Sequence, residues 1–95
     1  MNLKLEWMSQ LRVAAGQALQ TVECDEGARL KRALELALDQ LPADRARALK
    51  VLLFDGESLT QGVLVALDGV QVPHGTDPEL SDGATLLLGS PIAGG

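Results

Sequence analysis

The sequence has few of the residues that disulfides and metal sites require. Its 95 residues include a single cysteine, Cys24, and a single histidine, His74. One cysteine cannot form an internal disulfide, and this pair is too small a ligand set for a zinc site. The composition suits a reducing compartment. We therefore expect a cytoplasmic protein without a metal site.

Aromatic residues and positive charge are also scarce. The chain has one Trp, one Phe and no Tyr, and its eight basic and thirteen acidic residues give a net charge of -5. Nucleic-acid binding needs a basic surface for phosphates and commonly aromatic rings that stack on bases. We expect no nucleic-acid partner, and a basic protein partner instead.

The sequence also lacks a long hydrophobic segment. No apolar run approaches the roughly 20 residues of a membrane-spanning helix, and Lys4 and Glu6 are unlike the start of a signal peptide. We expect no membrane association. With 46% hydrophobic residues, the chain fits one small domain whose core leaves little room for an internal active site.

The first half of the chain predicts two strands and a helix. In residues 3–8 every second residue is leucine or tryptophan, which indicates a strand with one buried face. Residues 9–16 predict a broad connection with room for a helical turn. Residues 17–24 favour a second strand, with either face inside. Residues 28–41 predict a helix, since an apolar stripe recurs at three- and four-residue spacing. The stripe is Leu30, Ala33, Leu34, Ala37, Leu38 and Leu41.

Residues on both sides of this helix also mark its ends. Asp25 and Glu26 precede it, where the helix dipole favours negative charge, and Pro42 stops it. Residues 43–50 are compatible with a short helix. They lead into the apolar run at residues 51–54, which we expect to be a buried strand.

The second half predicts strands joined by tight turns. Residues 63–67 are continuously apolar, as in a strand covered on both faces. Asp68-Gly69 followed by residues 70–72 indicates a hairpin, and residues 84–88 form the last expected strand. The order strand, strand, helix, strand, strand, strand predicts an α+β fold: a small mixed sheet with one main helix packed on one face.

Few side chains suggest chemistry. His74 has no second imidazole to act with, and Asp25 and Glu26 beside Cys24 oppose a reactive thiolate. The loop carboxylates Asp77, Glu79 and Asp82 lack the spacing of a calcium loop. We expect no catalytic residue, and a chain that is not an enzyme by itself.

The exception is the segment Pro91-Ile92-Ala93-Gly94-Gly95, which follows the last expected strand. Two glycines in succession make a narrow thread that can pass through a tight channel in another protein. Such a thread would bring the Gly95 carboxylate to a buried reaction centre, although a paired glycine end is also compatible with a frayed terminus.

Five short segments resemble, in order, the small subunit of molybdopterin synthase (MoaD), ThiS and related ubiquitin-like modifiers. They are residues 8–16, 25–28, 63–69, 80–84 and 91–95. The resemblance implies a ubiquitin-like β-grasp domain over residues 1–89 and a tail over residues 90–95. It further implies that an adenylating enzyme of the ubiquitin-activating type uses ATP and magnesium to activate Gly95, while this chain itself binds no cofactor.

The resemblance also implies how the enzyme holds the chain. Residues 91–94 would be threaded into the enzyme. From the one-helix fold itself we further expect the enzyme to grip the sheet face near the last strands through Leu64, Val72 and Leu86, which stay exposed there unless they belong to the core. Three functions remain open: a sulfur carrier for molybdopterin, tRNA or thiamine-type thiolation, a modifier conjugated to lysines, and a binding module with an inert tail. The further partners would be a sulfur-acceptor enzyme subunit, or a conjugating enzyme and its targets.

Overall fold

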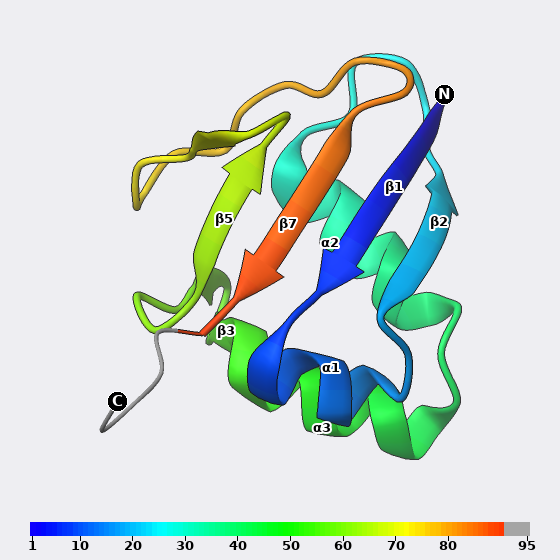
Figure 1. Ribbon diagram of the computed structural model, residues 1–95, viewed down its shortest axis with the longest axis vertical. Coiled ribbons are helices and arrows are strands. Elements are labelled where there is room, and N and C mark those ends of the chain that lie inside the picture. Colours follow the sequence, from blue (N-terminus) through cyan, green and yellow to red (C-terminus); the bar gives the residue numbers. More distant parts are fainter. Residues whose placement is uncertain (91–95) are drawn as a thin grey trace.

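Five strands form one mixed sheet in the computed structural model, which describes residues 1–90 (Figure 1). The strands are β1 (Asn2–Trp7), β2 (Leu19–Glu23), β5 (Leu64–Leu67), β6 (Val70–Gln71) and β7 (Thr85–Gly89). Their order is β2-β1-β7-β5-β6. β1 and β7 are parallel, and every other neighbouring pair is antiparallel. The first and last strands therefore lie side by side within the sheet.

Three helices accompany the sheet. α2 (Leu30–Asp39) crosses behind it, while α1 (Ser9–Ala15) and α3 (Ala43–Leu53) pack together at the end where β1 and β7 finish (Figure 1). A small hairpin of β3 (Phe54–Asp55) and β4 (Ser58–Leu59) follows α3. The expected α+β architecture with one main helix on the sheet is confirmed, and α1 and α3 are additions to it.

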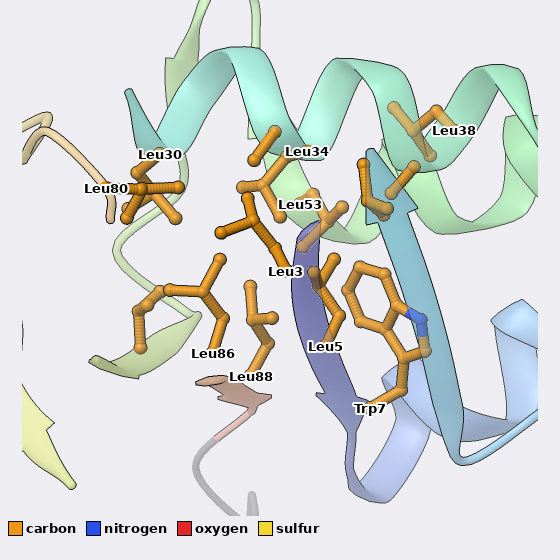
Figure 2. Packing of buried hydrophobic residues seen from close by; sticks show 14 of the residues in the cluster. Leu3, Leu5, Trp7, Leu30, Leu34, Leu38, Leu53, Leu80, Leu86 and Leu88 are labelled. Atoms are coloured by element: carbon orange, nitrogen blue, oxygen red, sulfur yellow. The ribbon is translucent and has the colours of Figure 1, made fainter. Parts of the chain in front are cut away.

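The core fills the space between α2 and the sheet. Alternate residues of β1 and β7 point toward the leucines of α2 (Figure 2). The predicted apolar stripe is confirmed, because five of its six residues are buried and Leu41 is half-buried. Helical spacing placed these residues on one face, and burial of their apolar area stabilises the contact.

A buried glutamine joins this sheet to the C-terminal end of α2. The indole Nε1 of Trp7 donates to Gln20 Oε1 at 3.0 Å. Gln20 Nε2 donates to the carbonyl of Ala37 at 2.8 Å and to Gln40 Oε1 at 3.3 Å. Gln20 is the one buried polar residue in the described part of the chain. Both ends of its amide are satisfied, as burial of a polar group requires.

The N-terminal end of α2 is held from a distant loop. Asp77 Oδ1 accepts a hydrogen bond from the backbone N–H of Lys31 at 2.8 Å, and the carbonyl of Pro78 accepts one from Leu30 at 3.0 Å. Free N–H groups at a helix start need such acceptors. The sequence-based expectation for Asp25 and Glu26 was wrong, because α2 starts at Leu30 and has no acidic residue in its first turn.

Two other expectations from hydrophobicity are corrected. Residues 51–53 complete α3 instead of starting a buried strand; within them Leu53 is buried but Val51 is 74% exposed. The continuous apolar run of residues 63–67 was expected to be covered on both faces, yet Val65 is buried and Leu64 is exposed. Residues 9–15 form the complete helix α1, more than the single turn expected.

The predicted hairpin turn at Asp68-Gly69 is confirmed. β5 and β6 pair across it, with Leu67 opposite Val70. Asp68 has φ 48° and Gly69 has φ 86°, and two positive φ values are the requirement of a type I′ turn. Asp68 Oδ1 also accepts the backbone N–H of Thr85 at 2.9 Å, which ties the turn to the start of β7.

The glutamine contact gives a stability prediction. Gln20→Leu should lower the free energy of unfolding by about 1–3 kcal/mol, because the indole N–H of Trp7 would be buried without an acceptor and the carbonyl of Ala37 would keep only its bond from the Gln40 N–H. Urea unfolding followed by Trp7 fluorescence measures the change. Thr21→Leu, an exposed position on the same strand, is the control and should change stability little. Equal stability of the two variants would contradict the prediction.

Candidate functional site

The candidate site is the face of the sheet that no helix covers, here called the open face (Figure 1). The strand register places Leu19, Glu6, Leu87, Ala66 and Gln71 in one row across all five strands. Glu6, Leu87 and Ala66 each lie between residues that face the core, since successive side chains of a strand point to opposite faces, and Leu19 and Gln71 extend the row onto the edge strands. The open face therefore carries apolar residues as well as charged ones.

Apolar side chains gather where β7 ends. Leu64 pairs with Gly89, and the Cβ of Met8 lies 3.5 Å from the position that a Cβ on Gly89 would take. Met8 is 46%, Leu19 56% and Leu64 41% exposed, whereas Leu87 and Ala66 are half-buried. We call Met8, Leu19, Leu64, Ala66 and Leu87 the open-face patch. Exposed apolar residues gathered on one face are a common mark of an interaction surface.

Of the three predicted docking residues, one lies on the open face. Leu64 belongs to the open-face patch. Leu86 pairs with Leu5 and is 0% exposed, so its expected exposure was wrong. Val72 was also misplaced: its N–H bonds to the carbonyl of Val65, and its half-buried side chain packs against the core. Leu86 and Val72 contribute to the helix side of the sheet.

Met8, Leu19 and Leu87 were not predicted from the sequence. Leu87 was hidden because Leu86, Leu87 and Leu88 are all leucine, and a run of identical residues has no alternation to reveal its faces. The signal that resolves it is the pairing with β1, where Leu5 meets Leu86 and Glu6 meets Leu87. A polar residue opposite Leu87 marks the open face.

The predicted tail residues are mostly outside the described part of the chain. Pro91, Ile92, Ala93, Gly94 and Gly95 lie beyond residue 90, so their threading and activation remain predictions. Gly89 closes β7, and Ser90 after it is half-buried. The segment that carries the tail thus begins between Met8 and Leu64, next to the open-face patch.

The other candidate side chains, such as Cys24, Asp77 and Asp82, are buried or hydrogen-bonded within the domain. Burial raises the pKa of the Cys24 thiol, and this effect outweighs the lowering by the amino terminus and Arg32. Asp82 Oδ1 accepts the backbone N–H of Asn2 at 2.7 Å, and Asp77 caps α2. No group of three or more His, Cys, Asp or Glu within residues 1–90 is arranged to hold a metal ion. None of the helices in this region is long and apolar enough to cross a membrane.

Comparison with known proteins rests on structure. No family model matches the chain, and no curated protein matches it by sequence. The solved structure of SAMP1 from Haloferax volcanii superposes with a TM-score of 0.81 at 22% identity, covering 100% of both chains. The chain has the ubiquitin-like β-grasp fold.

Two further β-grasp neighbours come from other organisms. One is described as a putative molybdopterin converting factor, subunit 1, from Pyrococcus furiosus, with TM-score 0.70, 24% identity and coverage of 97% of this chain and 99% of that one. The other is in the Amycolatopsis orientalis BexX/CysO complex, with TM-score 0.70, 24% identity and coverage of 98% and 99%. At these identities the likeness establishes the β-grasp fold.

The two faces of this β-grasp sheet should respond oppositely to one substitution. Leu64→Glu should leave a cooperative thermal transition near that of the unchanged protein, because its side chain already reaches water. Leu86→Glu should abolish the transition, because an unpaired carboxylate would be buried in the core. Circular dichroism melts of both variants test this, and similar melts would show that the faces are assigned wrongly.

Proposed function

We propose that the chain is a ubiquitin-like carrier whose Gly95 carboxylate is adenylated by an ATP-dependent enzyme of the ubiquitin-activating type and then converted to a thiocarboxylate. The observation that carries the proposal is that β7 ends within the open-face patch. An enzyme bound to the patch would already be next to the segment that leads to Gly95. The carrier would supply no catalytic group of its own.

The length of residues 91–95 suits a carrier that binds the enzyme through its domain and reacts through its last residue. Five extended residues span about 17 Å, so residues 91–95 are long enough to enter an active site while the domain stays on the enzyme surface. Gly94 and Gly95 add no side chains at the narrowest point. Misplacement of reacting atoms by about 1 Å can cost about a hundredfold in rate, which favours a terminal residue that crowds nothing.

The proposed chemistry has two steps. A carboxylate oxygen of Gly95 attacks the α-phosphorus of ATP, with magnesium bound in the enzyme, and pyrophosphate leaves. A sulfide-level sulfur nucleophile then attacks the acyl carbon and AMP leaves, which yields the thiocarboxylate. The acceptor would be an enzyme subunit of molybdopterin, tRNA or thiamine-type thiolation.

A protein modifier is the alternative. The same acyl-adenylate would pass to a cysteine thiol of a conjugating pathway and finally to lysines of target proteins. The structural neighbours support both uses, since one similar solved structure is described as small archaeal modifier protein 1 and another as a putative molybdopterin converting factor, subunit 1. A β-grasp module with an inert tail is the third possibility.

Removal of Gly95 tests whether Gly95 is the reactive residue. The truncated protein should lose ATP–pyrophosphate exchange catalysed by the cognate activating enzyme by at least about a hundredfold, while its circular dichroism melt stays unchanged. Gly95→Ala is the matched variant, since it keeps a carboxylate and adds one methyl group. Undiminished exchange by the truncated protein would contradict both the carrier and the modifier. Intact mass after addition of a sulfur donor separates them, because only the carrier replaces oxygen by sulfur.

The docking surface is tested separately. Leu64→Glu should raise the KM for the carrier in the exchange reaction by roughly tenfold or more, because a carboxylate would be placed in an apolar contact. Val70→Glu makes the same change at an exposed residue of β6 outside the patch, and should leave KM within about twofold. Equal effects of the two substitutions would place the contact elsewhere, even if Gly95 is the reactive residue.

A further inference from the structure

The charges of this acidic chain are unevenly distributed. The helices α1, α2 and α3 contain six basic and three acidic residues, whereas the rest of the sequence contains two basic and ten acidic residues. The three helices together thus carry more positive than negative side chains, although the whole chain is negative. A partner that contacts the helices therefore meets a different balance of charge from the one that the net charge suggests.

A groove of about 570 Å³ runs between α2 and α3 on the helix side of the sheet. Four of the eight basic residues of the chain line it: Arg47 and Lys50 from α3, and Lys31 and Arg32 from α2. Leu38, Ala46 and Phe54 supply apolar surface within it. We call this feature the α2–α3 groove.

Arg47 and Lys50 on the α3 side of the groove lie next to an exposed valine, Val51. Arg47, Lys50 and Val51 lie at spacings of three and four residues, so they share one face of α3. Val51 is among the most exposed large hydrophobic residues of the described chain. Apolar residues beside arginine are typical of protein interfaces.

We propose that the α2–α3 groove binds an acidic segment of a partner protein, with glutamates or aspartates at Arg47 and Lys50 and an apolar side chain against Phe54. This proposal does not depend on the chemistry at Gly95. The groove lies on the side of the sheet opposite to the open-face patch, so the two surfaces can be occupied at once.

Three carboxylates in the groove decide the class of partner. Glu35 and Asp39 on α2 and Glu57 in the hairpin also line it. A nucleic acid carries negative charge at every phosphate and would be repelled at these positions. A protein segment can place neutral or basic residues there, and only one aromatic residue, Phe54, lines the groove for a base to stack on.

The test is an NMR titration of the whole chain, which is labelled with nitrogen-15. The titrant is an acidic peptide with blocked ends, in which glutamates flank a pair of leucines. Chemical shift changes should concentrate on α2, α3 and the β3–β4 hairpin, and binding should weaken as salt is raised. No shifts at millimolar peptide, or shifts mainly on the open face, would overturn the proposal. Tighter binding of a single-stranded oligonucleotide at the same sites would overturn it in favour of nucleic acid.

Matched variants identify the charges involved. The double substitution Arg47→Glu with Lys50→Glu should raise the peptide Kd at least roughly fivefold, the size expected when two exposed ion pairs are lost. Lys4→Glu, an exposed lysine of β1 outside the groove, makes the same kind of change and should alter Kd less than about twofold. A similar effect of both would mean that only net charge matters, and would overturn the proposal.

A substitution that should strengthen peptide binding shows that the weaker binding of the double variant is not caused by loss of folding. Glu35→Gln removes a repelling carboxylate from the α2 wall and should tighten peptide binding by roughly twofold. If the charge-reversed protein is unfolded by circular dichroism, Arg47→Gln with Lys50→Gln replaces it and should weaken binding in the same direction. Unchanged or weaker binding by Glu35→Gln would contradict the placement of the acidic segment.

Discussion

The parallel pairing of β1 with β7 is the constraint on which the rest of the structure depends. It joins residues 2–7 to residues 85–89, so the sheet is complete only when both ends of the domain are in place. It also fixes the faces, because Leu5 opposite Leu86 directs Leu86 and Leu88 to the core and Leu87 to water. A slip by one residue would exchange these faces along the strand. The same pairing brings the end of β7 beside Met8, and thus sets where the open-face patch and the tail meet.

The hydrogen bonds of Gln20 are a second constraint on the core, because they fix the position of α2 on the sheet. Leucine contacts alone allow a helix to shift along a sheet at modest cost, since apolar contacts have no direction. The Trp7 N–H requires an acceptor at a defined angle, and Gln20 supplies it while its own amide donates to the Ala37 carbonyl. Asp77 and Pro78 hold the opposite end of the helix. α2 is therefore fixed at both ends by polar contacts and along its length by packing.

Local patterns predicted the parts of the fold that local physics determines. The stripe of α2, the alternation of β1 and the Asp68-Gly69 turn each depend on spacing or backbone conformation within a few residues. The face of Leu86 depends on pairing between the distant strands β1 and β7, and the cap at Lys31 comes from Asp77, 46 residues away. The exposed position of Val51 depends on how α3 packs against α1. The candidate site was predicted at Leu64 but was incomplete, because the register that gathers Met8, Leu19 and Leu87 is a long-range property.

Net charge is a poor guide to partners for a domain of this size. Screening limits the reach of a surface charge to about 8 Å at physiological ionic strength, whereas the domain measures 24 Å along its shortest axis. A segment in the α2–α3 groove therefore interacts with Arg47, Lys50 and their immediate neighbours much more than with the carboxylates of the distant loops. The open-face patch, where apolar contact dominates, is less sensitive to salt. The two surfaces thus differ in the force that acts at each, and one small domain can distinguish two kinds of partner without a change in its fold.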